Sequence, residues 1–186
     1  MVAGWTSTTA RVGLTSALSG VIVLSAAGCS PEQRTLVAVY VDERGTAQAL
    51  LRSCDDDGRV RGPELRGTMA RAAEGATSDA TQDTVPEASE TDEPWIGWDT
   101  RGPHVVADFP LFAPPAQWEA ETRGPQTLQP DYTYELAFGD PDDAYVYSAS
   151  VTFDVDHLAR VPAGEVLTRQ GAMTKGAFEG LARKAC

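Results

Sequence analysis

The chain has 186 residues and is acidic, because 27 Asp and Glu residues outnumber 15 Lys and Arg residues and give a formal net charge of −12 at pH 7. This charge argues against nucleic acid and anionic lipid headgroups as partners of the protein surface, since such partners are bound through clusters of basic side chains. The length suits a single domain with a sizeable hydrophobic core once a leader segment is set aside.

The first 28 residues have the pattern of a secretion signal. Arg11 precedes an apolar stretch over residues 12–27, whose most apolar part, residues 20–24, is far shorter than the roughly 20 residues of a membrane-spanning helix. Small residues then lead to Cys29. The segment could be an ordinary secretory signal cut after Ala27 or Gly28, or an uncleaved N-terminal anchor. Both alternatives place the rest of the chain outside the cytoplasm.

Residues 25–29, Ser-Ala-Ala-Gly-Cys, resemble the lipobox of bacterial lipoproteins, although Ala26 stands where Leu is commonest. The resemblance implies that residues 1–28 are removed and that Cys29 carries a diacylglyceryl thioether with fatty acyl chains such as palmitate. The lipid would hold the protein at the extracytoplasmic face of the cell membrane through a tether of residues 29–34. As a whole, the chain resembles small lipoproteins of actinobacteria that have no assigned activity.

The three cysteines of the chain fit this interpretation. Lipidation of Cys29 leaves Cys54 and Cys186, which we expect to form a disulfide in an oxidising compartment. Such a bridge would fix a C-terminus that otherwise tends to fray. Two free thiols are the alternative.

In the first half of the folded region, residues 35–41 are dense in β-branched and aromatic side chains and predict a buried strand. Residues 47–53 return after a Gly-containing turn and complete a hairpin. Residues 59–65 predict a weaker edge strand that is limited by Pro63. From about residue 68 to residue 93 the composition is polar and acidic, with few residues able to form a core, and predicts a disordered loop.

The second half predicts further strands and a final helix. Residues 132–138 and 144–155 alternate apolar and polar side chains across a turn, which is the strongest hairpin signal in the chain. Thr174 is expected to cap a helix over residues 175–184. Other expected elements are ordered chain from residues 94–98, a strand at 104–112, a helical turn at 156–160 and a short strand at 164–168. The sequence therefore predicts one mainly β domain over residues 35–186, an antiparallel sandwich or small barrel with a C-terminal helix.

No catalytic constellation is recognisable, and we assign no catalytic residue, cofactor or metal. The histidines, His104 and His157, lie in no known catalytic signature. The acidic turns at residues 55–58 and 140–143 could supply oxygen ligands for a cation, but hairpin turns also contain Asp and Gly for backbone reasons alone.

Aromatic side chains are the remaining candidates for ligand binding. Trp95, Trp98 and Trp118 lie in or beside irregular, Pro-rich segments, where they could stack on sugars or on partner proteins. The alternative is that these side chains belong to the hydrophobic core.

These observations lead to the hypothesis of a non-catalytic cell-envelope lipoprotein with a binding or structural role. Its expected partners are the membrane, through the lipid, and an envelope protein or glycan. One alternative is a glycosidase-like hydrolase of envelope polymers that uses acidic residues such as Asp140, Asp142, Asp143 or Asp154. This alternative requires two carboxylates about 5–10 Å apart in a cleft. Another is a secreted protein without a lipid.

Overall fold

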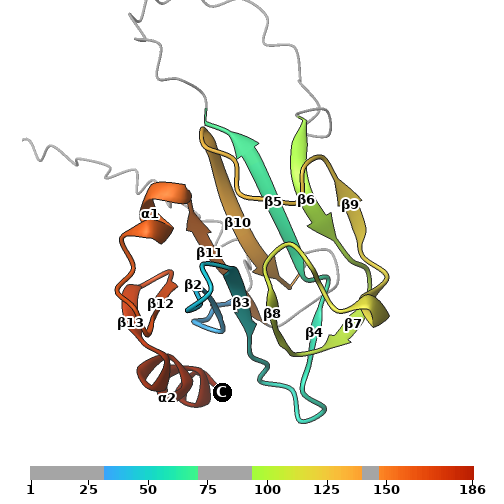
Figure 1. Ribbon diagram of the computed structural model, residues 1–186. Helices are drawn as coiled ribbons and strands as arrows, with labels where there is room; N and C mark the ends of the chain where they lie inside the picture. The colour runs from blue at the N-terminus through green and yellow to red at the C-terminus, as the bar shows by residue number, and fades with distance from the viewer. Residues whose placement is uncertain (1–31, 71–93, 140–146) are drawn as a thin grey trace, which may run out of the picture.

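The computed structural model describes residues 32–70, 94–139 and 147–186, and its regular structure is mostly β. Two open sheets of six and five strands pack face to face, with a two-stranded ribbon beside them (Figure 1). Among the described residues no sheet closes on itself, so the fold is a sandwich with a C-terminal helix and not a barrel. The predicted fold class is confirmed.

The larger sheet is antiparallel except for one short parallel pair at its edge. Its strands, in spatial order, are β1 (Glu32–Gln33), β11 (Tyr147–Phe153), β10 (Tyr132–Phe138), β5 (Glu64–Met69), β6 (Trp95–Asp99) and β9 (Glu121–Arg123). The parallel pair is β1 with β11, after which the chain crosses to the other sheet and begins β2.

The smaller sheet is antiparallel throughout. Its strands, in spatial order, are β13 (Gly171–Thr174), β12 (Glu165–Thr168), β2 (Val37–Val41), β3 (Ala47–Leu51) and β8 (Asp108–Pro110). The ribbon pairs β4 (Arg59–Arg61) with β7 (Pro103–Val105). The helical segments are the 3₁₀ turn η1 (Ala116–Trp118), α1 (Val155–Ala159) and α2 (Lys175–Ala185).

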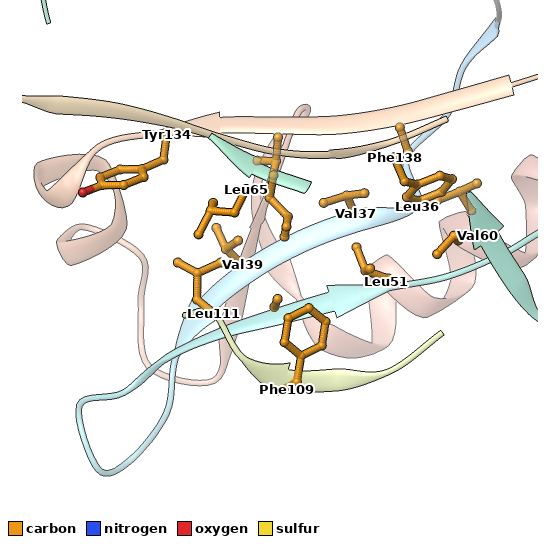
Figure 2. Close-up of a cluster of buried hydrophobic side chains, with 14 of the residues drawn as sticks. Leu36, Val37, Val39, Leu51, Val60, Leu65, Phe109, Leu111, Tyr134 and Phe138 are labelled. Atoms are coloured by element: carbon orange, nitrogen blue, oxygen red, sulfur yellow. The ribbon is translucent and has the colours of Figure 1, made fainter. Parts of the chain in front are cut away.

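The main core lies between the two sheets. Figure 2 shows Tyr134 and Phe138 of the larger sheet pointing toward Val39 and Leu51 of the smaller one. The alternation along β10 produces this arrangement, because successive side chains of a strand point to opposite faces. Its inward residues are buried, whereas Glu135 between them is exposed.

A second, smaller core lies on the other face of the five-stranded sheet. Ala38, Leu50 and Val166 contact Phe178 of α2, and all four side chains are buried. The Thr174 hydroxyl accepts a hydrogen bond from the Ala177 amide, which confirms the predicted helix cap. Helix α2 thus covers the smaller sheet, and Figure 1 shows it beside β12 and β13, away from β5, β6 and β9.

Ion pairs also hold α2 in place. Arg52, which follows β3, bonds Asp108 of β8 at 2.7 Å and Glu179 of α2. Lys175 approaches the other Asp108 oxygen at 3.0 Å. The hydrogen bond that Arg52 donates to Glu179 leads the causes that raise the Arg52 pKa, so this cation stays charged and links strand and helix at every physiological pH.

The predicted pairing of Cys54 with Cys186 is present. The two sulfur atoms lie 2.09 Å apart and the two Cα atoms 5.0 Å apart, across a sequence separation of 132 residues. The bridge joins the chain just after β3 to the residue that ends α2. It therefore fixes the last turn of the helix to the sheet that the helix covers.

Two strand predictions and the start of the predicted loop are wrong in detail. Residues 59–65 are not one edge strand: the chain breaks at Gly62 and Pro63, and β5 then runs through the interior of the larger sheet. Residues 68 and 69, predicted to lie in the acidic loop, belong to β5, where Thr68 pairs with Thr133 and Trp95. The strand predicted for residues 104–112 divides into β7 and β8, which belong to different sheets.

Other boundaries differ less. Strands β9 and β13 were not predicted, and β1 lies inside the segment expected to be only a tether. The 132–155 hairpin is confirmed through the pairing of β10 with β11, although residues 140–146 of its turn lie outside the described residues. The rest of the predicted acidic loop, residues 71–93, also lies outside them.

Candidate functional site

The outer face of the larger sheet contains a groove of about 670 Å³. Its floor is formed by small side chains, Ala137 of β10 and Ser148 and Ser150 of β11. Longer polar and charged side chains surround this floor. They are Gln33, Glu64, Arg66, Asp99, Arg101 and Glu135. The groove is therefore a polar hollow over the middle of the sheet.

The pairing register explains why these side chains meet. Ala137 lies directly opposite Glu64 on β5 and opposite Ser150 on β11. Glu135 lies opposite Arg66, so it is the diagonal neighbour of Glu64. Residues at even spacing share one face of a strand, and the inward residues between them are the core residues described above. The same alternation that builds the core thus places three acids and an arginine together outside.

Glu64 is the most perturbed acid of the groove. Its pKa is raised above the ordinary value, first because partial burial disfavours the charged carboxylate. Arg66 Nε, 2.7 Å from a Glu64 oxygen, opposes this shift, while the nearby carboxylates of Glu135 and Asp99 add to it. Negative charge is consequently crowded at this point of the groove.

Two of these acids have no counter-ion in the described part of the chain. Neither Asp99 nor Glu135 forms an ion pair or a side-chain hydrogen bond with another described residue. The hydroxyl of Ser148, a residue that is only 9% exposed, likewise lacks a hydrogen-bond partner there. Largely buried polar groups are nearly always hydrogen-bonded, so the hydroxyl of Ser148, which lines the groove, suits a ligand or water.

The three candidate tryptophans lie in different environments. Trp98 and Trp118 are buried in the core, with 0% and 3% of their surface exposed, and they pack on each other and on Phe109. The ring of Trp95 is half-buried on the outer face, where the guanidinium groups of Arg66 and Arg123 approach it at 5.3 and 4.5 Å. Of the three, only Trp95 presents a ring on the same face as the groove.

The other candidates have structural partners. In the acidic turn at residues 55–58, Asp57 accepts a hydrogen bond from the Arg59 amide. Asp154 caps α1 by accepting from the His157 amide, which leads the causes that lower the Asp154 pKa, and it also contacts the His157 ring. His104 bonds the Arg101 carbonyl. Within the described residues, no group of three or more acidic, histidine or cysteine side chains is arranged for a metal ion.

Several predicted sites lie outside the described residues: Cys29, the signal at residues 1–28 and the acids Asp140, Asp142 and Asp143. In the part of the chain that is described, no helix is both long enough and apolar enough to cross a bilayer.

The sequence interpretation missed the groove acids Glu64, Asp99 and Glu135. A signal for them was present, because Glu64, Arg66 and Thr68 alternate with Leu65 and Gly67 in the manner of a half-exposed strand. The composition of the following residues obscured this signal, since Thr68 was grouped with the acidic loop.

No protein-family model matches the chain, and no curated protein or solved structure is significantly similar to it. The site is therefore interpreted from its own geometry and charge.

Proposed function

We propose that the protein is a cell-envelope lipoprotein that is held at the outer face of the membrane by Cys29 and binds a ligand in the sheet-face groove. The observation that supports the proposal most is the place where β1 enters the fold. Glu32 is three residues from Cys29, and Gln33 lines the groove. Three extended residues span at most about 11 Å, so a lipid on Cys29 would keep the groove close to the membrane surface.

The disulfide is consistent with this location. Cysteine pairs persist in oxidising compartments outside the cytoplasm, and lipidation of Cys29 accounts for the third cysteine of the chain. The acidic composition supports an anchor that acts through its lipid, because a protein of net charge −12 gains little from anionic headgroups.

Intact mass spectrometry of the membrane-fraction protein tests the anchor. We expect a mature chain that begins at Cys29 and carries the added mass of acyl chains, and a Cys29→Ser variant that leaves the membrane fraction. A chain that begins elsewhere, or one without acyl mass, would instead establish the unlipidated secreted protein and contradict this proposal.

A hydrolase of envelope polymers is the second candidate, and the environment of Glu64 favours it. A carboxyl group with a raised pKa can act as a general acid when a second carboxyl group stands near it, and both Glu135 and Asp99 are neighbours of Glu64 here. Incubation of purified envelope polysaccharide with the mature protein and with a Glu64→Gln variant separates the two candidates. Reducing ends released by the wild type alone would establish hydrolysis, and no release would leave binding as the function.

A further inference from the structure

The proposed groove has an unbalanced arrangement of charges. Glu135, Glu64 and Asp99 form a row across β10, β5 and β6, because Glu135 is diagonal to Glu64 and the pairing of Leu65 with Trp98 brings Asp99 opposite Glu64. Neighbouring strands lie about 4.8 Å apart, so the row extends over roughly 10 Å. Three carboxylates thus follow one line across the sheet.

The cations of the groove do not neutralise this row. Arg66 bonds Glu64, and its guanidinium group lies over the ring of Trp95. Arg101 lines the groove two residues beyond Asp99 but forms no ion pair with a described residue. Among the described residues, half-buried Asp99 and exposed Glu135 are left without a side-chain donor, one at each end of the row.

A metal ion does not fit this row. The carboxylates are spread over three strands and do not converge, and no metal-binding group was found among the described residues. A hard cation needs several oxygen ligands at about 2.0–2.6 Å from one point. The spacing suits separate positive groups on one extended molecule.

We propose that the groove binds an organic ligand with two or more primary ammonium groups, and this inference rests on the proposed binding function. One ammonium group bonds Glu135 and another bonds Asp99, with Glu64 between them. Ser148 in the floor is only 9% exposed as a residue and has no side-chain hydrogen bond to a described residue; its hydroxyl accepts a hydrogen bond from the ligand or donates one to it. Binding of cations relieves the repulsion that crowds Glu64.

Two kinds of molecule have this chemistry, a linear polyamine and an oligosaccharide of glucosamine with free amino groups. Calorimetric titration of the mature, acylated protein in detergent with spermidine and with a glucosamine trimer distinguishes them. The N-acetylated trimer is the neutral control. We expect one site per chain for at least one ammonium ligand, no binding of the neutral trimer, and weaker binding as ionic strength rises.

Variants of opposite charge make the test specific. Glu135→Gln and Asp99→Asn should each lower the affinity for the ammonium ligand about tenfold, which is the scale of a charge-assisted hydrogen bond. Arg101→Gln should leave the affinity equal or higher, because it removes a positive charge from the groove. Glu43→Gln, in the exposed turn between β2 and β3, is the matched control and should change nothing. Thermal unfolding confirms that each variant is folded.

The inference would be overturned if the neutral trimer bound as tightly as the ammonium ligands, or if neither ammonium ligand bound. It would also be overturned if Glu43→Gln lowered the affinity as much as Glu135→Gln does, because the ligand would then be attracted by the net charge alone. A lower affinity of the Arg101→Gln variant for the ammonium ligand would overturn it too, since Arg101 would then be binding an anionic part of the ligand. These outcomes are distinct from failure of the anchor, which the mass of the mature chain reports independently of any ligand.

Discussion

The two sheets share one core but differ in what covers their outer faces. On the five-stranded sheet, Ala38 lies under α2 and is completely buried. On the six-stranded sheet, Ala137 occupies the equivalent kind of position, outward on a strand that also contributes to the core, and it forms the floor of an open groove. The first sheet is therefore covered by α2 over part of its outer face, whereas the outer face of the second carries an open groove.

The sequences of the strands reflect this difference. The apolar run Val37–Val41 has no alternation, which is typical of a strand that is covered on both faces. Strand β10 alternates and places Glu135 outward between buried neighbours. Charge follows the same division: the ions near α2 are paired across elements, while two groove acids are unpaired among the described residues.

The largest expected effect comes from placing one charge on each outer face. Ala38→Lys should destabilise the fold by on the order of 5 kcal/mol, because it buries an unpaired ammonium group under α2. Ala137→Lys should be tolerated, since its side chain lies in the open groove opposite Glu64. Denaturant unfolding of both variants measures the difference. Equal losses would show that the two outer faces are equally buried and would contradict the comparison.

The second prediction concerns the disulfide, which joins the chain after β3 of the five-stranded sheet to the C-terminal end of α2. Replacing Cys54 and Cys186 by Ser should lower the free energy of unfolding by about 3 kcal/mol, mainly because the unfolded chain gains freedom. Hydrogen exchange should increase most in α2, whose last residue loses its attachment, while β5 and β10 should keep their relative protection. Greater exchange in β5 than in α2 would show that the bridge stabilises the other sheet.

The smallest effect is a pair of pH dependences with opposite signs. Burial and neighbouring acids raise the Glu64 pKa above that of the unfolded chain. Its contribution to stability is therefore present at low pH and is lost as the pH rises through the folded-state pKa. Glu64→Gln should be more stable than the wild type at pH 7 and should lose this advantage toward pH 4.

Asp108 is the matched control on the covered sheet. Partial burial raises its pKa, but hydrogen bonds from Arg52 and Lys175 outweigh this effect, so the net shift is downward. Its stabilising contribution is present above the unfolded-state pKa and is lost as the pH falls. Asp108→Asn should consequently be less stable than the wild type at pH 7, with a difference that shrinks in acid. Thermal unfolding across this pH range tests both variants, and slopes of the same sign would contradict the assignment.

Much of the fold could be predicted because its signals are local. The alternation in residues 132–138, the hairpin around Gly45 and the cap at Thr174 each depend on neighbours in sequence. The pairing of Cys54 with Cys186 followed from the number of cysteines and the expected compartment.

The errors arose where a distant residue decides the local conformation. The predicted strand stopped at residue 65, but β5 continues through Gly67, whose missing side chain leaves room for the ring of Tyr134, since a Cβ there would lie 2.5 Å from that ring. Trp98 and Trp118 were candidates for a groove because of flanking irregular chain, yet both are buried. Their burial depends on the packing of the two sheets, which the neighbouring residues do not specify.

The sequence by itself determined the mainly β class, the strongest hairpin, the capped helix and the disulfide partners, because each depends on periodicity, on turn chemistry or on the cysteines present. Only the tertiary structure decided that α2 covers one sheet and leaves the other open. It also decided that one row is formed by Glu64, Asp99 and Glu135, although Glu64 and Glu135 are 71 positions apart in the sequence. The physical reason is strand register, which brings distant residues together and is set by how the whole core packs.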